Sequence, residues 1–432
     1  MRKQLLGNLN WLMAERILRI AVSLAIGIWV ARYLGPGGYG LLSFALSFVA
    51  LFGMLGKLSM DPVVIRELAK HPEREKEILG SVLRLKLWAS LAAAALALPA
   101  AWLAQPDDPL FLLLVAISAV GILFNAADAI DVFYQARVLS KYVVQARAVA
   151  FLAVSLAKVG LILGGFPVVW FALAGTMEIV LGAGLMAWAY HRREGGKAGW
   201  GWRGGASIQL LKDGWPLAAS ALLIVIHTRI DQVMIGQMLG EAQVGLYSAA
   251  VGISEAWLFV PGLVVQTVMP YFVRLREHDK ASYHFHLMRL YSVMFWGGVA
   301  AGVVAILLGE QFVRLLFGEA YAGAYGPLVF IVWTGMFIAQ SIARGIWLVS
   351  ENLQIFRLFN NLLIVPLNVA LNYIWIPEYG INGAAIASLV SVAAGSWLVP
   401  LMFASLRQSN LDMMRSIDPR YLFGKRQEPR LG

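Results

Sequence analysis

Long apolar runs separated by short polar segments occupy almost the whole 432-residue chain. A membrane-spanning helix needs about 20 mostly apolar residues, because a helix rises 1.5 Å per residue through roughly 30 Å of hydrocarbon. About twelve runs reach this length, so an all-α integral membrane protein is the expected fold class. The predicted spans are 11–31, 40–62, 81–104, 109–131, 142–165, 167–190, 213–236, 244–270, 287–309, 325–348, 354–376 and 381–404.

Composition excludes several other classes of protein. Apolar residues make up 59% of the chain and charged residues 14%, whereas soluble domains have roughly 45–50% and about 25%. This composition excludes a cytosolic globular protein and a disordered chain. We also exclude a nucleic-acid binder, because the residues behind the net charge of +10 lie in loops between the apolar runs. The absence of cysteine excludes thiolate metal sites and cysteine nucleophiles. The six histidines are scattered, so no metal site is expected, and we place His284 and His286 in a solvated polar loop.

The distribution of Lys and Arg predicts the orientation. They concentrate in one set of loops and in both tails, and the opposite loops offer little beyond Arg32 and Arg314. Because cytoplasmic loops carry the excess of positive charge, we expect both termini in the cytoplasm. The first run is expected to stay in the protein, since it carries Glu15, Arg16 and Arg19 and no signal-peptidase site follows. The outer loops are short, so an outer catalytic domain is not expected.

The chain also repeats itself. The pattern L-G-x-x-x-x-G-L-x-S-x-A begins at Leu34 and again at Leu239, and a similar offset places Arg147 on Asn361 and Lys158 on Asn372. An even number of spans separates the copies, which implies two six-helix bundles in parallel orientation. The expected domains are an N-terminal bundle (1–192), a cytoplasmic linker (193–212), a C-terminal bundle (213–404) and a basic cytoplasmic tail (405–432). The glycine-rich segment 35–40 is interpreted as a tight turn between helices, not a phosphate loop.

Charged side chains within the spans are the candidate functional residues. A charge at mid-membrane costs about 2.5–3.5 kcal/mol, so each should face a wet cavity or a partner. Glu15 and Arg19 lie one helical turn apart and could neutralise each other. Residues near the span ends are expected to reach the headgroup region: Asp61, Arg84, Lys86 and Arg289.

A polar stripe marks one of the later spans. Asn361, Asn368 and Asn372 share one helical face with Arg357. Such a stripe either lines a central cavity or makes interhelical hydrogen bonds.

Two motifs resemble a known family. Residues 30–45, which include Gly35-Pro36-Gly37-Gly38-Tyr39-Gly40, are similar to the start of Wzx-type polysaccharide flippases, as is the run 64–69. Residues 377–387 resemble a P-x-Y-G-I-x-G-A-A-I-A signature of the wider multidrug/oligosaccharidyl-lipid/polysaccharide (MOP) exporter superfamily. The resemblance implies a V-shaped pair of bundles that alternates between inward and outward access. It also implies an undecaprenyl-diphosphate-linked oligosaccharide, moved to the outer leaflet of a bacterial or archaeal cytoplasmic membrane.

A diphosphate cargo would need a wet, positively charged path, because an unpaired diphosphate in low dielectric is very costly. The candidate substrate-binding residues are Arg16, Arg19, Arg147, Lys158, Arg229, Arg344, Asn361, Asn368 and Asn372. No cofactor is expected, but coupling to H⁺ or Na⁺ is left open. The candidate ion-coupling carboxylates are Asp128, Asp131, Glu178, Asp231 and Glu255.

Other partners and functions remain open. Membrane lipids are expected partners, and the resemblance also allows a polysaccharide polymerase and a chain-length regulator. The main alternative is a multidrug or cation antiporter of the same superfamily, whose cavity should be rich in acid. A membrane glycosyltransferase or polymerase normally has a long outer loop, and a structural scaffold would not need so many charges within its spans.

Overall fold

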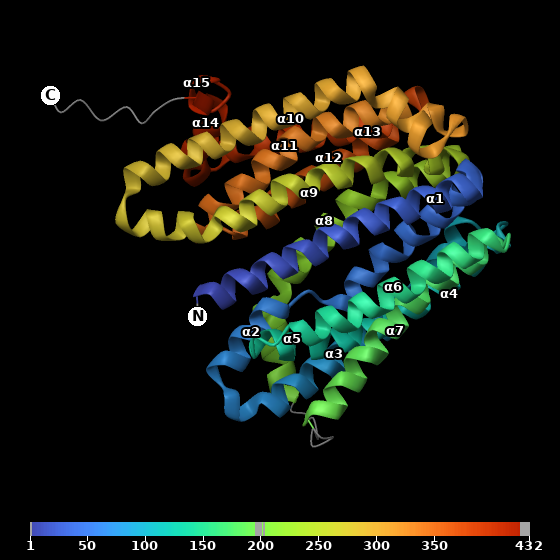
Figure 1. The fold of residues 1–432 in the computed structure, drawn as a ribbon, viewed down its shortest axis with the longest axis horizontal. Coiled ribbons are helices and arrows are strands. Elements are labelled where there is room, and N and C mark those ends of the chain that lie inside the picture. The colour runs from blue at the N-terminus through green and yellow to red at the C-terminus, as the bar shows by residue number, and fades with distance from the viewer. Residues whose placement is uncertain (1, 195–200, 202–203, 424–432) are drawn as a thin grey trace. The chain divides into compact units, whose positions relative to one another are not determined.

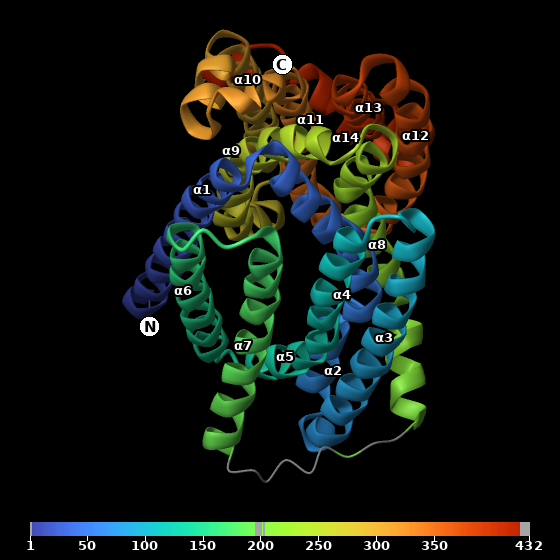
Figure 2. The ribbon, with the colours of Figure 1, turned by 90° about the vertical axis from the view of Figure 1, so that its right-hand side faces the viewer.

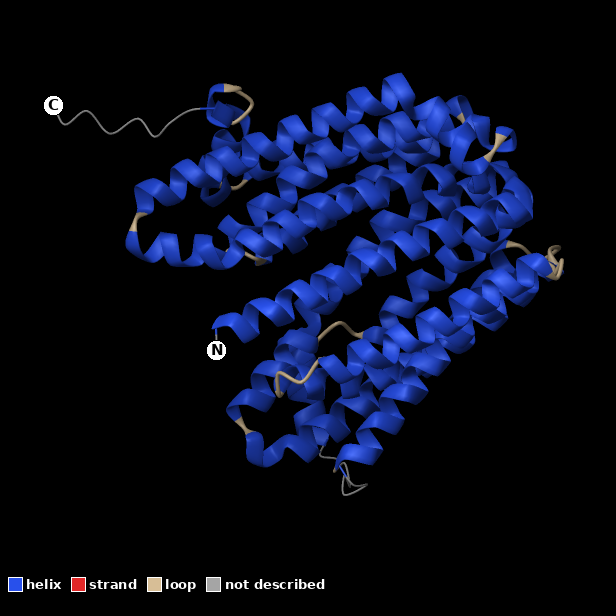
Figure 3. Ribbon diagram, viewed as in Figure 1, coloured by secondary structure: helices blue, strands red, loops and turns tan. Residues whose placement is uncertain are grey.

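The computed structural model describes the backbone of residues 2–194, 201 and 204–423, and the side chains of 19–194, 201 and 207–423. Every regular element in this part of the chain is a helix (Figure 3). Helices satisfy their backbone donors and acceptors internally, which a hydrocarbon environment requires. The all-α membrane fold predicted from the apolar runs is therefore confirmed. The chain divides into two compact units, Met1–Gly245 and Leu246–Gly432, which are described separately below.

The N-terminal unit holds the blue to light-green helices of Figure 1. Its helices are α1 (Arg2–Lys57), α2 (Asp61–Lys70), α3 (Glu75–Ala104), α4 (Pro109–Leu123), α5 (Asp128–Ala136), α6 (Lys141–Leu163), α7 (Val168–Glu194) and α8 (Gly204–Leu239). Helix α8 contacts α1 and α3 and so lies within this unit, although the sequence repeat groups it with the helices that follow. Packing and internal repetition thus divide the chain at different places. The repeat-based domain limits stay a prediction.

The C-terminal unit holds most of α9 and the helices after it. These are α9 (Glu241–His278), α10 (Lys280–Phe317), α11 (Tyr325–Ser350), α12 (Ile355–Tyr379), α13 (Ile381–Ala393), α14 (Ala404–Arg415) and α15 (Arg420–Phe423). The expected polar loop at His284 and His286 is wrong, because α10 starts at Lys280 and both residues lie in its first turns. The predicted basic tail begins with α14, and the Trp296 indole donates to the carbonyl oxygen of Ile417 at 3.1 Å.

Eleven helical segments of the described chain are long and apolar enough to cross a membrane. The first, Arg19–Lys70, holds two of the predicted spans, because α1 changes direction at Gly35 (Figure 2). Three predicted spans are not continuous helices. The 40–62 span crosses the break between α1, which ends at Lys57, and α2, which begins at Asp61. The 109–131 span is interrupted by a 3₁₀ turn at Phe124–Ala127, and the last span ends in a π turn at Ala394–Leu398.

The repeated glycine motif has a structural explanation. Gly35 and Gly240, the first glycines of the two copies, have φ of 66° and 88°, which favour glycine. The second glycines lie where the copies touch. A methyl group on Gly40 would lie 1.8 Å from the carbonyl oxygen of Glu241, and one on Gly245 would lie 2.0 Å from that of Pro36. The copies therefore pack backbone against backbone, and no neighbouring side chain could move aside to admit a larger residue.

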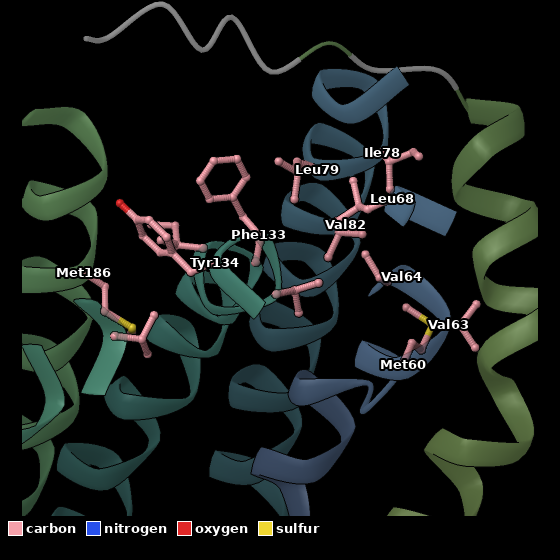
Figure 4. Close-up of a cluster of buried hydrophobic side chains, with 14 of the residues drawn as sticks. Met60, Val63, Val64, Leu68, Ile78, Leu79, Val82, Phe133, Tyr134 and Met186 are labelled. Carbon is pink, nitrogen blue, oxygen red and sulfur yellow. The ribbon is translucent and has the colours of Figure 1, made fainter. Parts of the chain in front are cut away.

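Each unit has its own buried apolar cluster. In the N-terminal unit, residues of α2, α3, α5, α6, α7 and α8 pack together, among them Met60, Val64, Leu79, Phe133 and Met186 (Figure 4). This cluster holds α5 and the start of α6 beside each other. The C-terminal cluster joins α9, α10, α11 and α14 around Tyr291. Burial corrects one expectation at this level: Lys86 does not reach the headgroup region, because it is fully buried and its Nζ lies 2.7 Å from Asp61 Oδ1.

Candidate functional site

A polar cavity of about 280 Å³ lies within the N-terminal unit, between α1, α5 and α6. Asp131 and Gln135 of α5, Arg147 of α6 and Arg19 of α1 supply its polar lining. Asp128 and Asp131 are near the start of α5, less than one helical turn apart. The buried cluster around Phe133 fixes the opposite face of α5. The packing of α5 and α6 in this cluster therefore positions the two carboxylates and Arg147.

Arg147 is the centre of an ion-pair network. Its Nη2 lies 3.1 Å from Asp128 Oδ1 and 2.9 Å from Asp131 Oδ2. Lys57 Nζ lies 3.9 Å from the other oxygen of Asp128. Arg19 donates to the Arg147 carbonyl oxygen at 3.3 Å. The network thus holds three cationic side chains against two carboxylates.

The network is accessible and leaves part of Arg147 available. The Arg147 side chain is 38% exposed, whereas those of Asp128 and Asp131 are 17% and 14% exposed. Both carboxylates use the same guanidinium nitrogen, and among the described side chains Nε and Nη1 have no hydrogen-bond partner. An incoming anion could therefore contact the free edge of the guanidinium before the ion pairs separate.

Other candidates of this unit lie outside the cavity lining. Lys158 of α6 and Glu178 of α7 form an ion pair at 3.7 Å. Asp231 of α8 is buried, and Arg229 is half-buried on the same helix. The side chain of Arg16 lies outside the described residues, so its predicted role is untested.

The candidates of the C-terminal unit differ in their surroundings. Arg344 is buried and donates to the backbone carbonyl oxygen of Ser396 at 3.0 Å. Asn368 and Asn372 are fully buried, with amide donors 3.2 Å from Ser388 Oγ and 3.4 Å from Asn368 Oδ1, respectively. The bond to Ser388 joins α12 to α13 and corresponds to the interhelical alternative for the polar stripe, whereas the bond between Asn372 and Asn368 lies within α12. Asn361 is half-buried, and Glu255 of α9 is exposed.

Sequence analysis missed two members of the network. Lys57 ends α1, and Gln135 follows Asp131 by one turn and donates to it at 2.9 Å. The signal for Gln135 was its spacing from Asp131, which places both on one face of a helix. No sequence signal pairs Lys57 with Asp128, because α1 and α5 are far apart in the chain. Among the described residues, no group of His, Asp and Glu side chains could hold a metal ion.

The described residues thus form a multi-pass helical membrane protein with an ion-paired polar cavity in its N-terminal unit. The chain belongs to the polysaccharide biosynthesis protein family, which matches residues 5–276. It is 29% identical over 185 residues to the "Probable flippase AglR" of Haloferax volcanii, covering 40% of this chain and 37% of that protein. It is 23% identical over 181 residues to the "Capsular polysaccharide biosynthesis protein CapF" of Staphylococcus aureus, covering 41% and 45%. The chain thus matches less than half the length of either relative.

Solved structures show the same fold over nearly the whole chain. The lipid II flippase MurJ in an inward closed conformation has a TM-score of 0.71 at 14% identity, covering 96% of this chain and 93% of that one. An inward-facing multidrug transporter of the MATE family, from the MOP superfamily, has a TM-score of 0.61 at 16% identity, covering 92% and 96%. At these identities the likeness concerns the fold alone. The predicted MOP-type fold is confirmed.

Proposed function

We propose that this protein moves an undecaprenyl-diphosphate-linked oligosaccharide from the cytoplasmic to the outer leaflet of a bacterial or archaeal cytoplasmic membrane. Membership of the polysaccharide biosynthesis family and the resemblance to a probable flippase support the class of cargo. The observation that carries the chemical mechanism is Arg147, held by two carboxylates beside a polar cavity with one edge of its guanidinium unoccupied among the described residues.

A diphosphate cargo would account for the arginine side chains that line the cavity. The lipid tail can stay in the bilayer, but the diphosphate must be compensated by charge wherever water is scarce. A guanidinium presents a planar set of donors that matches phosphate oxygens, and it stays charged at any physiological pH. Arg19 and Arg147 line one cavity, so together they offer two such groups to one anion.

Exchange of partners would make binding reversible. In the structure, Arg147 is neutralised by Asp128 and Asp131. A diphosphate that takes over Arg147 would leave both carboxylates without that partner. The released pair could then accept H⁺ or Na⁺, which would couple cargo movement to an ion gradient. When the cargo leaves, the carboxylates recover the guanidinium and the ion is released.

The charge balance favours this function over export of cations. The network has one more cationic group than carboxylates, and each carboxylate is already paired. A cationic drug would have to displace Arg147 and would meet Arg19 and Lys57 as repelling charges. Transport of an anionic headgroup needs only an exchange of partners for Arg147.

The experiment that tests the proposal is charge reversal in cells from which the gene has been deleted. Deletion should cause glycan-loaded carrier lipid to accumulate on the cytoplasmic leaflet, and the wild-type gene should reverse this. Arg147→Glu places a third carboxylate beside Asp128 and Asp131. It should lower export by about 100-fold, equivalent to about 2.7 kcal/mol.

Arg274→Glu is the matched control. Arg274 is exposed on α9, where its Nε donates to the carbonyl oxygen of Pro270. The Arg274→Glu variant should support normal export at equal protein levels. Full export by Arg147→Glu at normal protein levels would exclude the proposed role of Arg147, and a deletion without accumulated glycan-lipid would exclude the cargo.

A further inference from the structure

A second groove lies between α6 and α7, apart from the polar cavity. It has a volume of about 470 Å³. From α6, Tyr142, Gln145, Ala146 and Val149 line it at the spacing of one helical face, and α7 contributes the matching face of its last turns: Leu185, Trp188, Ala189, Arg192 and Arg193. The groove therefore follows two neighbouring helices from their charged ends into their apolar parts.

At one end of the groove, cationic side chains lie against aromatic rings. The Arg193 guanidinium lies 3.5 Å from the centre of the Tyr142 ring, and that of Arg192 lies 5.3 Å from the Trp188 ring. Lys141 Nζ lies 5.0 Å from the Tyr142 ring. Within the described part of the chain, none of these three cations forms an ion pair with a carboxylate. The nearby carboxylate of Glu194 is engaged by Arg137 at 3.3 Å.

The other end of the groove is apolar and open. Val149 at this end is 57% exposed, and Leu156, further along α6, is 73% exposed; Trp188, between the two ends, is 58% exposed. Exposed apolar side chains of this kind on a membrane-spanning helix are suited to contact with hydrocarbon. Trp188 and the two arginines occupy the end of α7, where aromatic and basic residues typically meet the headgroup layer. A dissolved anion would use only the charged end, whereas a phospholipid fills both ends.

We propose that the α6–α7 groove binds one anionic phospholipid of the surrounding bilayer. Its phosphate contacts Arg192 and Arg193, and an acyl chain lies along Val149 and Leu185. Charge complementarity selects an anionic headgroup, because the cationic end has no carboxylate partner among the described residues. The bound lipid packs against the helix that carries Arg147, so membrane composition would affect the stability of α6 against α7. This site is separate from the cavity assigned to the cargo.

The test measures lipid binding in nanodiscs by quenching of Trp188 fluorescence. Phosphatidylglycerol and phosphatidylcholine with brominated acyl chains are compared, and the Trp188→Phe variant identifies the part of the signal that arises from Trp188. Brominated phosphatidylglycerol should quench Trp188 preferentially. In the double variant Arg192→Gln/Arg193→Gln, this preference should fall by roughly 30-fold, since each of the two basic residues near the surface contributes about 1 kcal/mol.

The double variant Arg274→Gln/Lys280→Gln removes the same net charge from two exposed positions elsewhere. It should keep the wild-type preference, and both double variants should melt at similar temperatures. An unchanged preference in Arg192→Gln/Arg193→Gln, or an equal loss in the control, would overturn the proposal. Displacement by inorganic phosphate would show a simple anion site and overturn it. Stronger binding of undecaprenyl phosphate than of phosphatidylglycerol would assign the groove to the carrier lipid instead.

Discussion

Arg147 and Arg344 both lie on membrane-spanning helices, but their surroundings differ. Arg147 is 38% exposed beside a cavity and is paired with two carboxylates. Arg344 is 6% exposed and donates to a backbone carbonyl oxygen. An exposed ion pair can exchange one partner for another at little cost, whereas a buried guanidinium must stay with the groups that satisfy it. The same residue type is therefore a partly exposed ion-pair partner in one unit and a buried hydrogen-bond donor in the other.

Positions matched by the sequence repeat show the same difference. Lys158 is partly exposed and pairs with Glu178, while the matched Asn372 is fully buried beside Asn368. The repeat thus preserves where polar side chains occur along the helix. It does not preserve whether they carry charge or contact water.

The largest difference between the two surroundings should appear when each arginine is replaced. Arg344→Ala should lower the free energy of unfolding by roughly 2–4 kcal/mol, because it leaves a cavity and an unsatisfied carbonyl group. Arg147→Gln should lower it by less, about 1 kcal/mol, because the Arg147 side chain is partly exposed and Asp128 keeps Lys57 as a partner, while export falls strongly. Melting in detergent and export in cells measure the two effects. Equal destabilisation by both variants would show that exposure does not separate their roles.

A smaller effect is expected at the matched pair. Asn372→Leu should cost roughly 1–3 kcal/mol, because the buried carboxamide oxygen of Asn368 loses its donor. Lys158→Met removes the charge but keeps an unbranched side chain only one heavy atom shorter, and it should cost less than about 1 kcal/mol. Thermal melting of both variants checks the ranking. If Lys158→Met were the more destabilising of the two, the matched positions would have to be reinterpreted.

The smallest effect should appear in pH dependence within α14. Burial raises the pKa of Asp412 above its ordinary 3.8, although His284, 3.7 Å away, together with Arg415 and Gln408, acts in the opposite direction. The folded protein therefore holds this proton more tightly than the unfolded chain, and stability rises as the pH falls through the raised pKa. Asp412→Asn should flatten this part of the melting-temperature profile.

Asp418→Asn, at a carboxylate whose side chain is 45% exposed, is the control and should keep the wild-type slope. A wild-type slope in Asp412→Asn would assign the pH dependence to another group.

The fold could be predicted because hydrocarbon thickness imposes one length and one structure on each apolar run. The breaks within the predicted spans could not be predicted from the sequence. The 3₁₀ turn at Phe124–Ala127 contains no proline or glycine from which it could be predicted. It packs against α3 and α7, which are separate in the chain.

The candidate site was predictable in part. The rule that charges within spans need partners singled out Asp128, Asp131 and Arg147, and the structure brings them together. Which charges pair depends on how separate helices pack, so the bonds of Lys57 and Lys86 could not be foreseen. The burial of Arg344 likewise follows from neighbours that are distant in sequence. Candidate residues could be chosen from sequence, but their exposure required three-dimensional packing.

Gly40 and Gly245 suggest how the two copies could diverge so far in chemistry. Each glycine meets main-chain atoms of the opposite copy, Glu241 for one and Pro36 for the other. Every residue type carries a main-chain carbonyl group, so this contact constrains the two glycines and not the side chains of Glu241 and Pro36. Selection could therefore retain these two glycines while the side chains of the two copies acquired different charge and burial.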